Sequence, residues 1–268
     1  MFSLRRVNIF RTAFIRSANM SCVTPDEYTH VVRKEDVVDF CARCVEKVGI
    51  SSEHSRVLGE VLVAGDYRGH YSHGINRLAM YVRDVELKVC DSNATPVIEK
   101  QTASTALVNG KNLLGPVVGN FAMNLAIKKA KETGIAWVAV RAGWYSIMAA
   151  KQGMIGISCT NTSPLVYPTR SKARTVGTNP ITIAAPSSKP GDEFVLDMAT
   201  SAVALGKLEM CRRRGLPIPE GWGADKNGRV SVMKISLVYQ MIMGYVCNQF
   251  FSKMIRLLEE PSQLCGVA

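Results

Sequence analysis

The periodicity of apolar residues changes near residue 95, and this change limits the folds that the chain can adopt. Before it, apolar residues recur every three to four positions, which is typical of amphipathic helices. This pattern predicts three helices within residues 34–88. The first covers residues 37–48, the second begins with Ser51 or Ser52 as its N-cap, and the third has Leu78 and Val85 on one apolar stripe.

Beyond residue 95, short strand-like segments alternate with helical patterns. The segments "TALVNG", "IAWVAVR", "GMIGISC", "NPITIAAP" and "EFVLDMATS" predict strands, with "IAWVAVR" fully buried, and "GNFAMNLAIKKAKETG" predicts a helix that ends at Gly134. Strands alternating with helices indicate a mixed α/β layer. Gly110, Gly115 and Gly119 precede this helix but match neither the dinucleotide fingerprint nor the Walker spacing, so we interpret them as structural.

The net charge of +11 raises the question of nucleic-acid binding. Four arginines precede the first acidic residue, Asp26, and most of the remaining positive charges are scattered singly. The run "CRRRG" at 211–215 is interpreted as a solvated loop. Because there is no basic stripe and no aromatic platform, we expect no nucleic-acid partner.

The eight cysteines lack the spacing of a disulfide scaffold, which favours free thiols in a reducing compartment. Cys41 and Cys44 have the spacing of a redox or zinc motif, but no second ligand pair accompanies them. They also fall within a helical apolar pattern. We therefore expect both thiols to face the core.

The first 25 residues are rich in arginine, contain serine and lack acidic residues. These features are typical of a mitochondrial transit peptide, and a disordered basic tail is the alternative. The expected location is therefore cytoplasmic, or mitochondrial if residues 1–25 act as a transit peptide. The apolar stretch near the other end, from Ile235 to Phe251, is too short and too polar for a membrane span, so no membrane partner is expected.

The segment "DYRGHYSHGINRL", residues 66–78, holds two of the four histidines of the chain. Two histidines are too few for zinc, so we predict no metal site. A helix capped by Ser72 would place His73 in its first turn, where the helix dipole disfavours the imidazolium form. Arg77 would then lie on the same face, positioned to hold a carboxylate. This spacing fits acid–base chemistry on a 2-keto acid, and a hydrogen-bonded turn histidine is the alternative.

The same segment resembles the signature of the type 2 malate/L-lactate dehydrogenases. The resemblance covers about residues 28–228 and continues through "AIKKAKETGIAWVAVR", "FVLDMATSAVALGK" and "LPIPEGWGADKNG". It implies an α/β fold that is not of the Rossmann type, with a helical N-terminal part and a mixed α/β cofactor domain. It also implies a homodimer that uses NAD or NADP to interconvert a small 2-hydroxy acid and its 2-keto acid.

By this resemblance, His73 and Asp197 are catalytic, with His73 as the proton donor and acceptor. Ser72 and Arg77 belong to the substrate site. The cofactor is expected along "TNTSP", "GTNP" and "FVLDMA", through backbone amides and small side chains. The residues concerned are Thr160, Asn161, Gly177, Thr178, Asn179, Val195, Leu196, Met198 and Ala199.

The sequence departs from the family pattern in two places. Relatives carry a Ser-Asn-His-x-Gly segment that helps to form the substrate site, whereas here Arg141 runs directly into "AGWY". Relatives also continue through a Gly-Tyr-Lys-Gly segment and further helices, whereas this chain diverges after Arg229. We therefore expect an internal loss and a tail that integrates poorly into the fold.

These observations predict four regions and two candidate functions. The regions are a basic leader (1–25), a helical part with the His73 motif (26–92), an incomplete cofactor domain (93–229) and a divergent tail (230–268). The first function is an NAD(P)-dependent oxidoreductase for malate- or lactate-type acids. The alternative is a catalytically impaired, truncated homologue that binds a nucleotide or another subunit.

Overall fold

The computed structural model describes residues 30–140, 145–168, 171, 173–189, 191–224, 230–231 and 242–243. The chain divides into two units, Met1–Asp36 and Val37–Ala268. In the first unit, an exposed ion pair joins Arg33 to Asp36 at 2.8 Å. The predicted leader, the junction after Arg141 and most of the tail lie outside the described residues.

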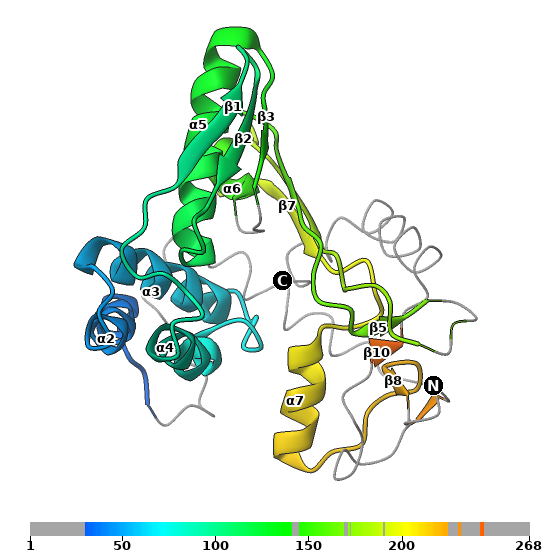
Figure 1. The fold of residues 1–268 in the computed structure, drawn as a ribbon. Helices are drawn as coiled ribbons and strands as arrows, with labels where there is room; N and C mark the ends of the chain where they lie inside the picture. Colours follow the sequence, from blue (N-terminus) through cyan, green and yellow to red (C-terminus); the bar gives the residue numbers. More distant parts are fainter. Residues whose placement is uncertain are drawn as a thin grey trace. The chain divides into compact units, whose positions relative to one another are not determined.

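The three predicted helices are confirmed (Figure 1). They are α2 (Lys34–Glu46), α3 (Ser52–Tyr67) and α4 (Leu78–Glu86). Ser51 is the N-cap of α3, since its hydroxyl accepts a hydrogen bond from the His54 amide. The apolar faces of the helices form one buried cluster that includes Leu58, Leu62, Leu78 and Val85. Removal of this apolar surface from water is the main force that holds them together.

Cys41 is fully buried in this cluster, and Cys44 packs half-buried against it. Burial raises the pKa of the Cys41 thiol to about 11, because a thiolate would lose its hydration there. The thiol therefore stays protonated at neutral pH. The interpretation of Cys41 as a core residue is confirmed.

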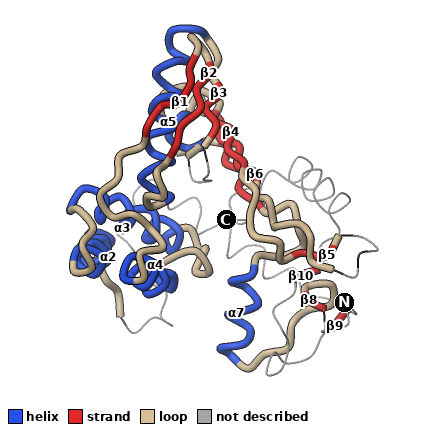
Figure 2. The backbone as a smooth tube through the Cα atoms, viewed as in Figure 1, coloured by secondary structure: helices blue, strands red, loops and turns tan. Residues whose placement is uncertain are grey.

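The first sheet has the order β1–β2–β3 and carries helix α5 on one face (Figure 2). Its strands are β1 (Val97–Gln101), β2 (Thr105–Asn109) and β3 (Trp137–Ala139). Helix α5 (Gly115–Thr133) ends at Gly134 in the left-handed region, as predicted. Strand β1 was not predicted, and the burial of β3 was predicted wrongly. Trp137 is 69% exposed, because β3 is an edge strand that pairs only with β2 among the described residues.

The second sheet is antiparallel, with the order β4–β6–β7. Its strands, all predicted, are β4 (Gly156–Cys159), β6 (Ile181–Ala185) and β7 (Phe194–Met198). The short helix α6 (Ser146–Ala150) packs on β4 and β6. The contact between α6 and β4 is close, since a Cβ added at Gly156 would lie 2.2 Å from the Ser146 carbonyl oxygen.

A third sheet has the order β5–β10–β8–β9. It combines β5 (Val166–Tyr167) and β8 (Gly223–Ala224) with β9 (Val230–Ser231) and β10 (Ile242–Met243). The last two strands belong to the segment that was expected to integrate poorly. That expectation is wrong at these positions, because both strands make backbone ladder pairings with the preceding part of the chain.

The "CRRRG" run also differs from its prediction. It forms the last turn of α7 (Leu205–Arg214), and Gly215 closes the helix in the left-handed region. Three arginines in this turn face solvent, where cations interact favourably with the carbonyl end of the helix. The run is solvated as predicted, but it is helical.

Gly110, before α5, and Gly119, within its second turn, have structural roles. A Cβ at Gly119 would lie 1.8 Å from the Tyr145 ring, and one at Gly110 would lie 2.8 Å from the Val118 side chain. Tyr145 is itself buried and donates a hydrogen bond to the Gly115 carbonyl oxygen. These glycines therefore admit a tyrosine and a helix at close range.

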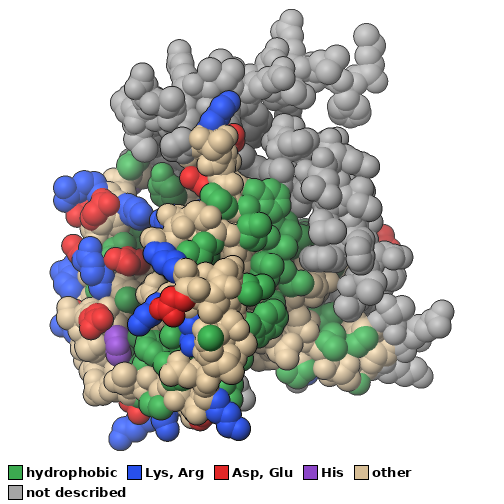
Figure 3. All heavy atoms as spheres, turned by 90° about the horizontal axis from the view of Figure 1, so that it is seen from above, with side chains coloured by type: hydrophobic (Ala, Val, Ile, Leu, Met, Phe, Trp, Pro, Cys, Tyr) green, Lys and Arg blue, Asp and Glu red, His purple; other side chains and the backbone are tan. Residues whose placement is uncertain are grey.

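Charged side chains of both signs are interspersed on the surface, beside a band of hydrophobic side chains on the face shown in Figure 3. Large apolar residues exposed on the strands and the segments next to them include Leu107, Ile135, Trp137 and Ile157. Among the described residues, no helix combines the length and apolar character needed to cross a membrane.

Candidate functional site

The loop that carries His70 and His73 is fixed by the end of α3. The His70 amide donates to the Gly65 carbonyl oxygen, and the His73 amide donates to the His70 carbonyl oxygen, both at 2.8 Å. A Cβ at Gly65 would lie 3.2 Å from the His73 carbonyl oxygen. The two imidazoles lie edge-on, with ring centroids 6.1 Å apart.

The predicted cap at Ser72 is wrong. Helical structure begins two residues after His73, with the 3₁₀ turn η2 (Ile75–Arg77), and continues as α4. Asp66 supplies the cap, because its Oδ2 accepts a 2.8 Å hydrogen bond from the Ile75 amide. This carboxylate, nine residues before Ile75, takes the role predicted for Ser72, and a Cβ at Gly74 would overlap the Asp66 carboxylate.

Ser72 instead contacts His73 directly. Its Oγ lies 2.8 Å from His73 Nδ1, and Ser72 itself is buried. A serine hydroxyl can accept from an Nδ1–H or donate to a bare Nδ1. The contact therefore persists in both protonation states of the ring and leaves Nε2 as the nitrogen that can exchange a proton with a ligand.

Arg77, the last residue of η2, is already engaged on one side. Its Nε donates to the Ser72 carbonyl oxygen at 2.8 Å. One of its terminal nitrogens lies 2.9 Å from Glu209 Oε2, as an ion pair whose angle does not satisfy a hydrogen bond. Both side chains of this pair are largely buried, with 23% and 16% of their surfaces exposed. The remaining N–H groups of Arg77 are the ones left for a substrate carboxylate.

Helix α7 packs directly on this loop. A Cβ at Gly206 would lie 2.3 Å from Ser72 Cβ and 2.8 Å from the Arg77 guanidinium. Only a glycine lets the backbone of α7 come so close. The face of α7 that carries Gly206 and Glu209 therefore lies against the His73 segment, and the charge of Lys207 acts on His73.

Asp197, at the end of β7, belongs to the same electrostatic environment. Its Oδ1 accepts a 2.9 Å hydrogen bond from Thr182 Oγ1 on the neighbouring strand β6. The charge of Asp197 favours protonation of both His70 and His73. Asp197 thus lies near enough to His73 for its charge to act on the imidazole.

The pKa of His73 nevertheless lies below its ordinary value. Loss of hydration is the largest cause, followed by His70 and Arg77, with Lys207 adding to them against the opposing effect of Asp197. His73 is exposed as a residue, so its loss of hydration is incomplete, and the neighbouring positive charges act in the same downward direction. The helix dipole invoked from sequence is not the cause, because His73 precedes the helix. His73 is thus favoured as the neutral imidazole near pH 7.

The two polar turns expected to line the cofactor lie against each other. Thr162 Oγ1 accepts from the Thr178 amide at 2.8 Å, and Asn179 Oδ1 accepts from the Thr162 amide at 3.0 Å. A Cβ at Gly177 would lie 2.2 Å from Thr162 Oγ1. These bonds occupy two of the backbone amides that were expected to face the cofactor. Thr160 and Asn161 lie in the first turn, where the Thr160 hydroxyl donates to the Asn161 carbonyl oxygen.

The β7 residues divide between two faces. Leu196 and Met198 are buried in an apolar cluster, so their side chains cannot contact a ligand. Val195 and Ala199 are half-buried, and they alternate with these core positions, as Asp197 does. Within the predicted set, the face that carries Asp197 is the one available to a cofactor.

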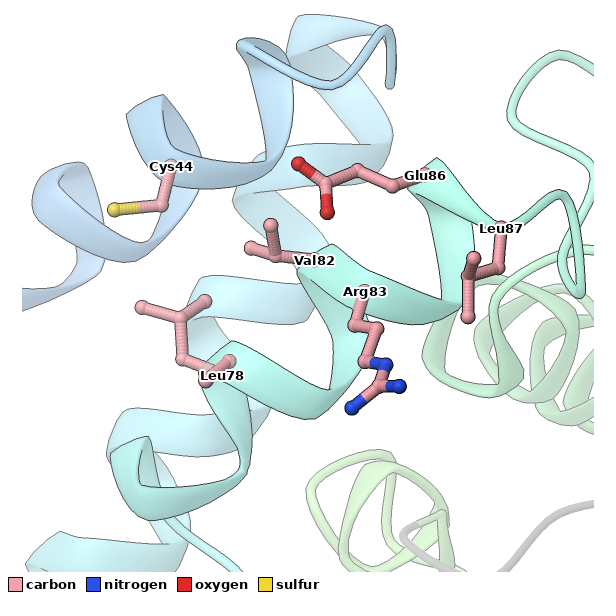
Figure 4. A pocket seen from close by; sticks show the side chains of 7 residues that line it. Cys44, Leu78, Val82, Arg83, Glu86 and Leu87 are labelled. Atoms are coloured by element: carbon pink, nitrogen blue, oxygen red, sulfur yellow. The ribbon is translucent and has the colours of Figure 1, made fainter.

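A surface hollow of about 470 Å³ lies elsewhere, between α2 and α4 (Figure 4). It is lined by Cys44, Leu78, Val82, Arg83 and Glu86, among others, and contains none of the predicted site residues. In the described part of the chain, no three His, Cys, Asp or Glu side chains gather in a way that could hold a metal ion.

Comparison with known proteins identifies the family. Residues 32–233 match the malate/L-lactate dehydrogenase family, and the chain belongs to this family. It is 43% identical over 213 residues to malate dehydrogenase of Pyrococcus abyssi, covering 77% of this chain and 58% of that one. It is 35% identical over 260 residues to malate/(S)-sulfolactate dehydrogenase of Methanothermus fervidus, covering 88% and 76%.

Solved structures agree with the sequence match. The crystal structure of malate dehydrogenase from Entamoeba histolytica superposes with a TM-score of 0.72 at 32% identity, covering 77% of this chain and 59% of that one. The α/β fold implied by the resemblance is therefore confirmed. The chain spans less than two thirds of the length of the Pyrococcus and Entamoeba proteins.

Sequence reasoning did not find Asp66, Lys207, Glu209 or Thr182 as parts of this site. The glycine in "LGK" preceding Lys207 was the available signal, because a glycine in the first turn of a helix allows close approach of another segment. The glycine alone does not indicate that the segment it contacts is the one around Ser72.

Proposed function

We propose that this chain carries the proton-transfer and substrate-binding loop of an NAD(P)-dependent oxidoreductase that interconverts a 2-hydroxy acid and its 2-keto acid. The observation that carries the proposal is the arrangement around His73. A neutral, partly exposed imidazole is bonded to Ser72 and lies beside both Arg77 and Asp197. This combination provides a proton acceptor, an anion-binding group and a counter-charge in one place.

Oxidation of a 2-hydroxy acid removes a proton from the hydroxyl oxygen and a hydride from C2. His73 Nε2 accepts the proton, and the resulting imidazolium donates its Nδ1–H to Ser72. Asp197 stabilises this charged form, whereas Arg77 and Lys207 oppose it. In the reverse direction, the imidazolium returns the proton to the keto oxygen while a hydride reaches C2.

A nicotinamide dinucleotide would supply the hydride acceptor. The polar groups of the two turns fit the uncharged parts of such a cofactor. The hydroxyls of Thr160 and Thr178 and the amides of Asn161 and Asn179 suit ribose hydroxyls and a carboxamide. Val195 and Ala199 add small side chains on the face of β7 that carries Asp197, whereas Gly177 is buried against Thr162 and serves to hold the two turns together. Leu196 and Met198 would contribute through their backbone only, because their side chains are buried.

A second function is favoured by the state of Arg77. Its ion pair with Glu209 occupies one side of the guanidinium, so the bidentate grip on a carboxylate requires either the free side or a rearrangement. A chain in which Arg77 stays locked would bind a nucleotide, or pair with another subunit, without turnover. The homodimer, the choice between NAD and NADP and the acid used are likewise proposals.

The test is a fluorescence titration of the purified chain with NADH and NADPH, followed by oxaloacetate or pyruvate. We expect saturable binding of one cofactor and oxidation of it when the keto acid is added. His73→Gln should keep cofactor binding and lose about two or more orders of magnitude in rate. Binding without oxidation by the unaltered chain would favour the second function, and absence of binding would contradict both.

A further inference from the structure

We infer that Glu209 is a positioning residue of this site, which holds the Arg77 guanidinium in the orientation that presents its free end to the substrate carboxylate. The inference rests on the proposed function, and it assigns the ion pair between these two residues to the working state of the site rather than to a blocked one. Glu209 touches no substrate atom in this role and acts only through Arg77.

Helix α7 presents Glu209 to the site on one of its faces. Gly206 and Glu209 are three residues apart, so they lie on the same side of the helix. A Cβ at Gly206 would lie 2.3 Å from Ser72 Cβ and 2.8 Å from Arg77 Nη2, so this face lies directly against the segment around Ser72. One turn further on, Glu209 Oε2 lies 2.9 Å from the same nitrogen. The packing of the helix therefore sets the position of the Glu209 carboxylate.

Two of the three guanidinium nitrogens of Arg77 are engaged by the protein. Nε donates to the Ser72 carbonyl oxygen at 2.8 Å, and Nη2 lies against Glu209. In the part of the chain that the structure describes, Nη1 has no partner. The guanidinium is planar and rigid, so anchoring Nε and Nη2 also fixes the direction of Nη1. Nη1 and Nη2 together form the end of the fork that can grip a carboxylate through two hydrogen bonds.

The character of the ion pair favours positioning over blocking. Glu209 Oε2 is buried without a hydrogen bond, so its contact with Nη2 is electrostatic and leaves the N–H groups of this nitrogen available. Both side chains are largely buried, so water and salt screen the attraction only weakly. A blocking carboxylate would instead form the paired hydrogen bonds that a substrate carboxylate needs.

Glu209 affects the rate and the affinity differently. The contacts continue from Arg77 through Ser72 to the imidazole, since Ser72 Oγ lies 2.8 Å from His73 Nδ1. A carboxylate held by Arg77 is thereby set relative to His73, and misplacement by about 1 Å costs about a hundredfold in rate. The negative charge of Glu209 also repels a second anion, which weakens binding of the acid. Loss of this charge should therefore lower kcat without raising KM.

The experiment measures kcat and KM of the full chain for oxaloacetate with the reduced cofactor, with active sites counted by the cofactor titration. Glu209→Gln should lower kcat about 10- to 100-fold, while KM stays within about threefold or falls. Glu209→Asp keeps the charge and should retain more of the rate. Glu60→Gln is the matched control, since it removes the same charge from an exposed pair with Arg56 and should change neither constant.

A double-mutant cycle shows whether Glu209 acts through Arg77. In an Arg77→Met background, Glu209→Gln should change the remaining rate less than about threefold. A second readout is the NMR signal of the Arg77 Nε–H group, identified by its loss in Arg77→Met. Rotation of the guanidinium should be faster in Glu209→Gln than in the unaltered chain or in Glu60→Gln.

Three kinetic results would overturn the inference. They are a rise in KM with kcat unchanged, an equal loss of rate with and without Arg77, and a higher kcat in Glu209→Gln, which would show that Glu209 blocks the site. Absence of turnover by the unaltered chain would contradict the proposed function instead. The NMR measurement would still test Glu209 in that case, because equally restricted rotation of Arg77 in Glu209→Gln would overturn its positioning role.

Discussion

Replacing Gly206 with alanine should separate α7 from the His73 loop. The added Cβ would lie 2.3 Å from Ser72 Cβ and 3.0 Å from the Ser72 carbonyl oxygen. Favourable carbon contacts lie at about 3.5–4.0 Å, so the overlap exceeds about 1 Å and falls on atoms close to the backbone. Neither a rotamer change of Ser72 nor one of alanine can relieve it.

The expected cost follows from two opposing effects. Overpacking of this kind costs about 1–3 kcal/mol, whereas alanine gains up to about 1 kcal/mol over glycine within a helix. If α7 moves away to relieve the contact, the Arg77–Glu209 ion pair is also stretched from 2.9 Å. We therefore expect a net loss of about 1–2 kcal/mol in unfolding free energy, and a larger loss in binding of a keto acid.

The assay is equilibrium unfolding in urea, followed by tryptophan fluorescence, together with the ligand titration. Gly115→Ala is the matched control, because this position also lies at the start of a helix and has open space around its Cβ. The control should be neutral or slightly stabilising. A Gly206→Ala variant as stable and as competent in binding as the control would refute the reasoning.

Three further outcomes can be measured on the same chain. Gly119→Ala should destabilise the fold by about 1–3 kcal/mol in urea unfolding, because its Cβ would lie 1.8 Å from the buried Tyr145 ring; wild-type stability would contradict this. The lowered pKa of His73 implies stability that is present above about pH 6.5 and lost as the pH falls through that lowered value. The melting temperature of His73→Gln should therefore fall less between pH 7 and 5 than that of the unaltered chain, and parallel curves would refute the assignment. Thr162→Val removes the hydroxyl that accepts from the Thr178 amide, and should weaken NADH binding with little change in the far-UV circular dichroism spectrum; unchanged binding would exclude these turns from the cofactor site.

The local elements could be predicted because each carries its own periodicity. The helices α3 and α4 and the strands β6 and β7 follow directly from the spacing of their apolar residues. Burial was less predictable. The segment containing Trp137 has the composition of a buried strand, but its position at the edge of a sheet is set by tertiary pairing.

The site was predictable only as far as one continuous segment reached. His73 and Arg77 could be selected from their spacing, and the family resemblance added Asp197. The ion pair with Glu209 depends on a contact between distant segments. The cap at Asp66 lies within the same segment, but the turn geometry and not the spacing decides which side chain accepts from the Ile75 amide. Nothing in the local sequence around Ser72 shows that a carboxylate in α3 takes over its capping role.

The central claim is that His73 exchanges the proton while hydride moves between a 2-hydroxy acid and a nicotinamide cofactor. The most direct measurement incubates the chain with L-malate deuterated at C2 and the oxidised cofactor, and follows deuterium at C4 of the nicotinamide by mass spectrometry. This readout accumulates product and so detects slow turnover. We expect transfer by the unaltered chain and at least about a hundredfold less by His73→Gln. No transfer by the unaltered chain, or equal transfer by both proteins, would contradict the account.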